Sequence, residues 1–537
     1  MRRFTALLLA LVMTVCAVPC AAAGGFSDVP DGSWAAGAID EAVSLGLMEG
    51  MGGGEFGYGQ PVKRCEFATI LCRMFGWEAV SPETPSFTDA APGAWYYSAV
   101  ETAAANGAVD PGGQFRPEEA ITRAEMAVMF VRALGYAPLA EKAERVAEPP
   151  FSDVTEDVGY ITVASDIGMI NGVGGGEFDP DGTALREHLA AMMARIYPVM
   201  SGETAWTHAF YAISSYPQRE LTRGMDAVTA GWSRMVVEDG AARLDTSDGD
   251  WRIPDSYEDI LDYLDEGDTP LKLGVYMGPE YAEILTDPEL RAQAVGAICS
   301  ELGREYAEFG ANPYSGVTID FEGLSGEAQR EGFSAFLREL RDAMDSELTL
   351  YVMVQPVAEG GYFDGFDYRA IGEAADKVIL MAHDYNATDL SGFEGTEYYK
   401  TAAGAPIADV YYSLRELTDP DTGVADRSKL ALAVSFGNLA WQIDENGALV
   451  SSYPARPSTA TVEQRLAQPD TVTGWSDEFA MPWAEYTTES GSRWFLWHED
   501  AGSVSAKLRL ARLMGLGGVS FWRLGEMPEG VKWGEKG

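Results

Sequence analysis

The chain has 537 residues, with 83 acidic and 38 basic side chains and a formal net charge of −45 at pH 7. Its length exceeds what one hydrophobic core usually supports, so we expect more than one domain. The excess of acid argues against nucleic acid or anionic lipid as partners, because both need clustered Lys and Arg. With 46% hydrophobic residues, the composition also excludes a wholly disordered acidic protein.

The first 23 residues have the pattern of a secretory signal peptide. Arg2 and Arg3 precede a short apolar run at residues 7–18, followed by Ala21 and Ala23. The run is shorter than the about 20 residues of a membrane-spanning helix. We therefore expect cleavage after Ala23 and export, with no membrane attachment afterwards. The alternative is an uncleaved N-terminal anchor.

Three cysteines follow this segment, Cys65, Cys72 and Cys299. Cys65 and Cys72 lie seven residues apart in a predicted helix, which separates them by about 10 Å along its axis. That is too far for a disulfide, so the sequence predicts no disulfide framework. A secreted protein without disulfides suits a bacterial envelope.

A sequence repeat fills the chain from about residue 26 to residue 200. Each of three copies opens with Phe, Ser or Thr, and Asp, at residues 26–28, 87–89 and 151–153. A helical stretch ending in glycine follows, then a glycine-rich turn and a second amphipathic helix. The second helices begin at corresponding arginines, Arg64, Arg123 and Arg186.

These copies resemble the S-layer homology (SLH) module, most clearly at Ile121-Thr122-Arg123-Ala124-Glu125. The resemblance implies an all-α bundle of three SLH repeats that binds a secondary cell-wall polysaccharide. We place the repeats at residues 24–82, 83–145 and 146–203. The protein is then expected to be secreted and associated with the cell wall or S-layer of a Gram-positive type of envelope.

The same resemblance implies a wall-polysaccharide site in which an arginine pairs with a ligand carboxylate and a tryptophan covers a sugar face. Its residues are Arg64, Arg123, Arg186, Trp34 and Trp95. The third copy departs from the pattern, with Ala184-Leu185 and His188 in place of the usual residues, so we expect its groove to bind more weakly. The alternative is that the arginines only cap helices or pair with neighbouring acids.

From residue 204 onward, short apolar runs alternate with longer helical patterns. The predicted strands are Ala209–Ser215, Ala227–Met235, Leu271–Met277, Gly316–Phe321, Leu348–Gln355, Lys377–Met381, Lys429–Phe436 and Gly517–Trp522. Eight buried strands with helical crossovers predict an α/β fold, a (β/α)8 TIM barrel over residues 204–537. A doubly wound open sheet is the alternative, but no glycine-rich phosphate loop follows the first strand.

In such a barrel the chemistry lies at the C-terminal strand ends. Thr318, Asp320 and Glu322 end the fourth strand and share one face, because side chains alternate along a strand. Two close carboxylates raise the proton affinity of at least one of them, which suits a general acid. The sixth strand ends in Met381-Ala382-His383-Asp384-Tyr385, and the eighth ends in Trp522, a possible platform for a sugar.

These strand ends resemble glycoside hydrolase family 18, the chitinase-like barrels, over about residues 205–530. The likeness is greatest to the bacterial cell-wall N-acetylglucosaminidase branch. It implies substrate-assisted retaining hydrolysis of β-linked N-acetylglucosamine glycans, with Glu322 as the catalytic acid and Asp320 orienting the substrate acetamide. Asp384, Tyr385 and His383 complete the implied catalytic set. The expected substrate-binding residues are Trp522, Thr318, Met381, Gln355 and Tyr211.

The sequence departs from the family signature at three positions. Ser315 and Thr318 stand where the signature has its first two aspartates, and His383 stands where the family usually has tyrosine. Two further hypotheses therefore remain: a carbohydrate-binding protein without turnover, and a structural S-layer component. We favour the enzyme because Glu322 is intact.

The sequence predicts no metal and no cofactor, since its four histidines have no spacing suited to zinc. It leaves open whether the substrate is chitin or peptidoglycan, and whether cleavage is exo or endo. The segment Asn438–Tyr486 is expected to bear on the second question.

Overall fold

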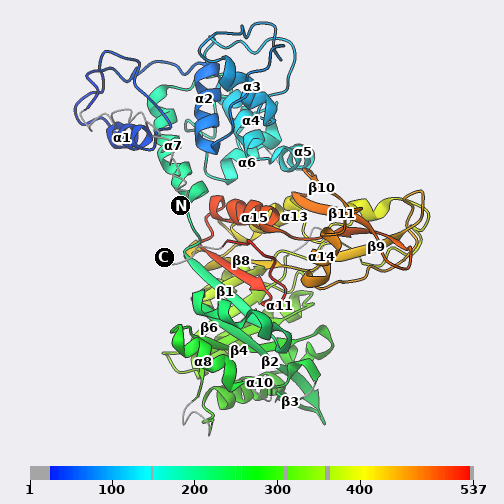
Figure 1. Cartoon of the computed structure of the whole chain (residues 1–537). Coiled ribbons are helices and arrows are strands. Elements are labelled where there is room, and N and C mark those ends of the chain that lie inside the picture. Colours follow the sequence, from blue (N-terminus) through cyan, green and yellow to red (C-terminus); the bar gives the residue numbers. More distant parts are fainter. Residues whose placement is uncertain are drawn as a thin grey trace, which may run out of the picture. The chain divides into compact units, whose positions relative to one another are not determined.

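The computed structural model describes residues 25–146, 149–247, 249–254, 257–306, 312–356, 363–386 and 388–532. The predicted signal peptide lies outside these residues. The described chain forms two compact units (Figure 1). One contains residues 25–126 and 180–197, and the other contains residues 127–179 and 198–532.

The first unit is helical. It contains α1 (Ala36–Ser44), α2 (Arg64–Phe75), α3 (Tyr97–Ala105), the start of α4 (Arg123–Ala133) and most of α7 (Arg186–Ser201). Short segments before α2, α4 and α7 pair with one another through the bridges Pro61–Leu185, Lys63–Ala120 and Thr122–Thr183. The three copies of the repeat therefore meet pairwise at corresponding positions.

The Asp that recurs in each copy binds the backbone of the same turn, the one that follows the glycine-rich segment. The Asp28 carboxylate accepts hydrogen bonds from the backbone N–H groups of residues 56–58 at 2.7–2.8 Å. Asp89 accepts from Phe115 and Arg116, and Asp153 accepts from residues 178 and 179. The repeated Phe-Ser/Thr-Asp pattern thus records one structural requirement, since a buried backbone donor needs an acceptor.

The second unit joins two helices of the repeat region to a barrel. Helices α5 (Ala137–Val146) and α6 (Val158–Asp166) pack on each other, and α5 contacts α13 (Ile407–Leu417). The division between the compact units therefore runs through the second and third repeats. The domain boundaries drawn from the sequence remain a prediction.

Eight parallel strands close the barrel in the order β1-β2-β4-β5-β6-β7-β8-β13, and β1 pairs with both β13 and β2. This confirms the predicted TIM barrel. The strands are β1 (Trp206–Tyr211), β2 (Ala227–Glu238), β4 (Leu271–Met277), β5 (Tyr314–Phe321), β6 (Thr349–Val354), β7 (Lys377–Met381), β8 (Leu430–Ser435) and β13 (Gly518–Trp522). A further strand, β3 (Ala241–Asp245), pairs antiparallel with β2.

Helices connect most of the parallel strands. They are α8 (Glu258–Glu266), α9 (Glu283–Thr286), α10 (Pro288–Leu302), α11 (Glu327–Ala343), α12 (Tyr368–Ala374), α13 and α15 (Ala501–Leu513). Helix α11 buries one apolar stripe: Phe333, Phe336, Leu337 and Leu340 are buried, as is Met344 just beyond its end. Burying such a stripe is what holds a crossover helix against the sheet.

The first strand was predicted too far along the chain. It ends at Tyr211, and the 3₁₀ segment η1 (Ile213–Gly224) follows at once. The Ser215 hydroxyl accepts a hydrogen bond from the backbone N–H of Ala212 and donates one to the carbonyl of Leu524. The bond to Ala212 is local and the bond to Leu524 is long-range, and together they turn the chain where its β-branched and aromatic residues had predicted continued strand.

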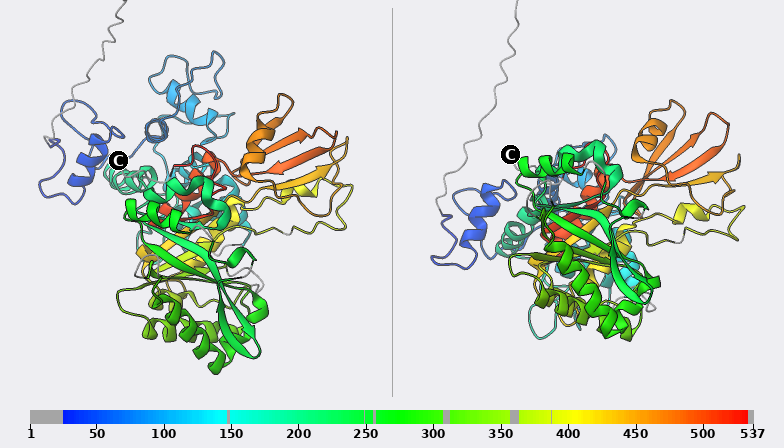
Figure 2. Two further views of the ribbon diagram at one scale, coloured as in Figure 1. Left: turned by 60° about the horizontal axis from the view of Figure 1, so that its bottom comes forward. Right: turned by 90° about the horizontal axis from the view of Figure 1, so that it is seen from below.

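A second sheet lies between β8 and α15 and was missed by the sequence. It is antiparallel, in the order β10-β11-β12-β9, and Figure 2 shows it, in orange, projecting from the barrel. Its elements are β9 (Leu439–Ile443), α14 (Thr459–Leu466), β10 (Val472–Ser476), β11 (Met481–Thr487) and β12 (Arg493–Trp497). Its core includes Trp441, Phe495, Trp497 and Tyr399.

The three described cysteines are free, as the sequence predicted. Within the described residues, no helix is both long and apolar enough to span a membrane.

Candidate functional site

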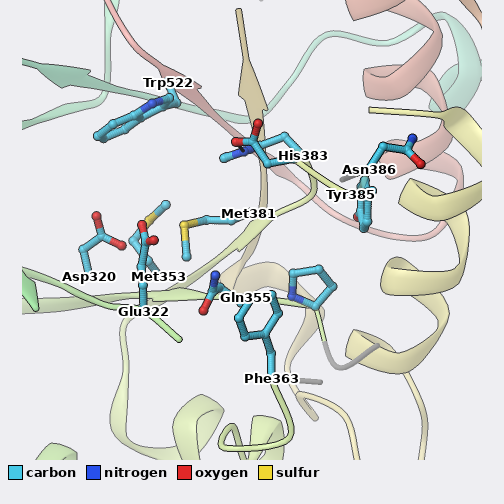
Figure 3. A pocket seen from close by; sticks show the side chains of 12 residues that line it. Asp320, Glu322, Met353, Gln355, Phe363, Met381, His383, Tyr385, Asn386 and Trp522 are labelled. Carbon is cyan, nitrogen blue, oxygen red and sulfur yellow. Dashed lines mark hydrogen bonds and ion pairs between the residues drawn. The ribbon is translucent and has the colours of Figure 1, made fainter. Parts of the chain in front are cut away.

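A cavity of about 530 Å³ opens at the C-terminal ends of the barrel strands. Figure 3 shows the side chains that line it. Most of the residues expected at the site lie here: Asp320, Glu322, Gln355, Met381, His383, Asp384, Tyr385 and Trp522. Thr318 and Tyr211 are not among its lining residues.

Asp320 and Glu322 lie next to each other in the cavity (Figure 3). Asp320 lies in β5 and Glu322 directly follows this strand, where alternation directs both side chains to the barrel mouth. Asp320 is only 5% exposed, and its Oδ1 has no hydrogen-bond partner among the described residues. Burial, followed by the charge of Glu322, raises the pKa of Asp320 well above its usual value. Burial also raises the pKa of Glu322, because it penalises the charged form of a carboxyl group.

His383 and Asp384 form a pair on the cavity wall. The Nδ1 atom of His383 lies 2.9 Å from Oδ2 of Asp384, while its Nε2 is buried without a partner among the described residues. Nη1 of Arg456 lies 3.8 Å from Oδ1 of Asp384. Burial alone raises the pKa of Asp384, but His383 and Arg456 together hold it below its usual value. Asp384 is therefore the ionised carboxylate of this site.

Trp522, Met381 and Gln355 lie where the sequence predicted. Trp522 is half-buried, and its ring contacts Phe210 edge-on at 5.0 Å. The Gln355 side-chain oxygen accepts a hydrogen bond from the backbone N–H of Gly323, directly after Glu322. Gln355 thus positions the end of β5 as well as lining the cavity.

Tyr385 is fixed by the fold. Its hydroxyl is hydrogen-bonded to Ser413 of α13 at 2.8 Å. Burial raises the pKa of Tyr385, so the hydroxyl stays neutral. The Tyr385 hydroxyl, which the sequence analysis had placed in the catalytic set, is therefore already hydrogen-bonded to Ser413.

Thr318 lies below the cavity in a buried network. Its hydroxyl is 2.6 Å from that of Thr229, which is 2.7 Å from Nε2 of His208. Nδ1 of His208 is 2.8 Å from the Ser520 hydroxyl. Burial lowers the pKa of His208 to about 3, so this network is neutral. Uncharged groups therefore occupy the place of the signature aspartate.

Several lining residues were not found from the sequence, including Met353, Phe363 and Asn386. Tyr276 was also missed. It pairs with Asp320 in the β4–β5 register, and its ring stacks on Trp251 at 4.4 Å. Burial, with the nearby Glu322 as the next cause, raises the pKa of Tyr276 to about 12. Its position one residue before the end of a barrel strand is the signal that could have identified it.

The predicted wall-binding arginines have protein partners. Arg64 is 7% exposed and pairs with Glu125 at 2.7 Å, and its Nε donates to the Phe115 carbonyl. Arg186 makes corresponding contacts in the first unit, with Glu66 and the Phe56 carbonyl. These are the pairs that the alternative interpretation expected, so a ligand role remains a prediction.

The aromatic residues that correspond to one another in the three copies differ in exposure. Trp34 is 63% exposed and Trp95 is 66% exposed, whereas Tyr160 of the third copy is buried. Trp95 and Arg186 line a cavity of about 150 Å³ in the first unit, together with Glu66 and Arg73. The Arg123 side chain is half-buried, and its backbone N–H donates a hydrogen bond to the Gly182 carbonyl.

Across the described residues, no group of three or more His, Cys, Asp and Glu side chains is arranged to hold a metal ion.

Comparison with family models gives two matches. Residues 249–526, just over half of the chain, match glycosyl hydrolases family 18. Residues 25–68 and 86–127 match the S-layer homology domain, which covers the first two copies of the repeat. The family 18 match begins after β1, β2 and β3.

Curated relatives resemble part of the chain. The cortical fragment-lytic enzyme of Bacillus subtilis (strain 168) is 27% identical over 249 residues, 45% of this chain and 52% of that protein. The putative sporulation-specific glycosylase YdhD of the same organism is 26% identical over 245 residues, with 45% and 53% covered. The chain therefore spans about half the length of these relatives. The crystal structure of the Bacillus cereus spore cortex-lytic enzyme SleL has 19% identity and a TM-score of 0.48, covering 62% of this chain and 73% of that one.

Proposed function

We propose that this chain, which belongs to glycosyl hydrolases family 18, is a glycosidase that cleaves β-linked N-acetylglucosamine glycans of the bacterial cell wall. The observation that carries this proposal is the buried pair Asp320 and Glu322 in the cavity at the barrel mouth.

The raised pKa values of this pair suit proton transfer. Glu322, whose pKa is raised by burial, donates its proton to the glycosidic oxygen as the bond to the leaving sugar breaks. The acetamide oxygen of the same N-acetylglucosamine attacks the anomeric carbon, which is substrate-assisted catalysis. Asp320 accepts a hydrogen bond from the acetamide N–H and stabilises the positive charge of the oxazolinium ion.

The second half of the reaction reverses the roles. Glu322 is now a carboxylate and takes a proton from water, which attacks the anomeric carbon and opens the oxazolinium ring. Asp384 is held ionised by His383 and Arg456 and adds negative charge to the cavity wall. Trp522 supports the face of the sugar.

The S-layer homology segments associate the chain with the cell surface. We propose that they bind a secondary wall polysaccharide, with Trp95 and Arg186 of the 150 Å³ cavity among the contact residues. The substrate and the anchor then belong to the same envelope, and the protein acts outside the cell.

Digestion of purified peptidoglycan tests this function. We expect the wild-type chain to release soluble sugars that end in N-acetylglucosamine, as identified by mass spectrometry. Glu322→Gln should lose at least about a hundredfold in rate, because general acid catalysis contributes about 10²–10⁴-fold. Glu331→Gln on the exposed side of α11 is the matched control and should retain full activity. Equal activity of Glu322→Gln and wild type would exclude the proposal.

A further inference from the structure

Trp522 lines two cavities. The first is the cavity of the acid pair, whose lining includes Asp320, Glu322 and Asp384. The second measures about 360 Å³ and is lined by Tyr211, Ser214, Trp251 and Arg523 besides Trp522. Its Trp251 stacks on Tyr276, the β4 neighbour of Asp320. The second cavity therefore adjoins the cavity of the acid pair, with Trp522 in the wall of both.

The two cavities have opposite charge. Arg523 is the one charged residue among the described residues that line the second cavity, and none of those residues is acidic. Its Nη1 lies 2.5 Å from the hydroxyl of Ser214, a neutral partner. No carboxylate in the described part of the chain forms an ion pair with Arg523. In a chain with 83 acidic side chains, a cationic cavity beside an anionic one indicates a ligand with a localised negative charge.

The remaining lining suits a sugar ring. Trp251 and Trp522 are half-buried indoles, and Tyr211 is buried beside Trp232. Aromatic faces cover the apolar face of a pyranose, while a guanidinium binds a carboxylate with charge-assisted hydrogen bonds. The chemistry of this cavity therefore fits an acidic sugar better than a neutral one.

We propose that the second cavity binds an N-acetylhexosamine that carries a carboxylate, with Arg523 as its anion partner. This inference rests on the proposed function and names its substrate class. In peptidoglycan strands from which the peptides have been removed, every second sugar carries a free lactyl carboxylate, whereas chitin is uniformly neutral. A neutral sugar at the acid pair and an acidic sugar at Arg523 match the alternating glycan without its peptides, so Arg523 determines specificity for peptide-free peptidoglycan strands.

The test compares two tetrasaccharides of equal length: a peptide-free alternating peptidoglycan fragment and chitotetraose. We expect Arg523→Gln to lower the ratio of kcat/KM for the acidic over the neutral glycan by about 10- to 100-fold, the effect of losing one charge-assisted contact. Arg338→Gln, which removes an exposed arginine from α11, should leave the ratio unchanged. Methyl esterification of the lactyl carboxylates should lower the wild-type ratio similarly and leave the Arg523→Gln ratio unaltered.

A ratio that Arg523→Gln leaves unchanged would overturn the inference while the proposed function stands. Failure of the proposed function would appear instead as a wild-type chain that hydrolyses neither glycan. Calorimetric binding to the Glu322→Gln protein, with and without Arg523→Gln, separates these failures. Arg523-dependent binding of the acidic tetrasaccharide supports the inference irrespective of turnover, and Arg523-independent binding overturns it.

Discussion

The carboxyl group of Asp320 is buried beside Glu322, and one of its oxygens has no partner among the described residues. Such a group is more easily protonated than in water, because burial penalises the charged form. The same property that suits catalysis reduces stability at neutral pH. The raised pKa of Asp320 therefore determines how the free energy of unfolding changes with pH.

Between the unfolded pKa of Asp320, near 3.8, and its raised folded pKa, the folded protein binds more protons than the unfolded chain. Stability therefore falls as pH rises through this interval, by up to about 1.4 kcal/mol per pH unit for one proton. Asp320→Asn removes this dependence. We expect its free energy of unfolding, relative to wild type, to increase from about pH 4 towards pH 7. Urea unfolding at several pH values measures this, and a difference that does not vary with pH would contradict it.

Thr318 tests whether the neutral network below the cavity can accept the signature carboxylate. Thr318→Asp would bury a third acid beside Asp320 and disrupt the contact with Thr229. We expect it to cost about 3–5 kcal/mol in the free energy of unfolding, as for an uncompensated buried charge. Thr318→Val, the uncharged control, should cost about 1–2 kcal/mol. Unchanged stability of Thr318→Asp in urea would show that the network does accept the charge.

Sequence reasoning predicted the residues at strand ends better than those between strands. Asp320, Glu322 and Trp522 could be placed because alternation along a strand fixes which side chains share the barrel mouth. Trp251 lies in η2 (Gly249–Trp251), a short 3₁₀ turn between β3 and α8, and no periodicity marks such a residue. Tyr385 was placed correctly, but its bond to Ser413 depends on a helix 28 residues away.

At the scale of elements, the barrel strands were predictable and the inserted sheet was not. The barrel strands are nearly continuous apolar runs because both their faces are buried. Strand β10 is largely exposed, and β11 alternates between buried and half-buried residues, so neither resembles a core strand. The turn between β11 and β12, with Gly491 at φ +85°, carried the best signal for a hairpin.

The junction between β12 and α15 depends on a buried ion pair. Nζ of Lys507 lies 2.6 and 2.8 Å from the two carboxylate oxygens of Glu499, and both side chains are 2% exposed. Ser503 also donates to Glu499 at 2.5 Å. This cluster fixes the point where the inserted sheet returns to the barrel.

Breaking this pair from one side should be costly. We expect Lys507→Met to lower the free energy of unfolding by about 3–5 kcal/mol, because Glu499 keeps a buried charge without its cation. Urea unfolding measures the loss. The exposed pair of Lys400 and Glu397 provides the control, and Lys400→Met should cost less than about 1 kcal/mol. Equal costs for the two variants would show that burial does not strengthen the dependence on Lys507.

At the scale of the whole molecule, helices α5 and α6 of the repeat region belong to the same compact unit as the barrel. Asp166 at the end of α6 forms an ion pair with Arg415 at 2.8 Å and accepts a hydrogen bond from the Tyr411 hydroxyl at 2.5 Å, and both partners lie on α13. Lys142 of α5 pairs with Asp409 of the same helix at 2.7 Å. The sequence repeat shows where the copies begin, but it carries no information about which face of a copy packs on another domain.

Hydrogen exchange tests whether this packing is a cooperative part of the fold. We expect backbone amides in α5 and α6 to be protected to the same extent as those in α13. Asp166→Ala leaves Arg415 and Tyr411 without their acceptor and should lower protection in α5 and α6 by about tenfold or more. Rapid exchange of α5 and α6 in the wild type, or exchange unaffected by Asp166→Ala, would contradict this.

In the proposed function, the buried pair Asp320 and Glu322 performs substrate-assisted, retaining hydrolysis. The most direct measurement is proton NMR of the sugar anomers formed in the first turnovers on a β-linked N-acetylglucosamine oligomer, before mutarotation. Two successive displacements at the anomeric carbon predict that the β anomer appears first. Initial formation of the α anomer would mean a single displacement by water and would contradict the mechanism.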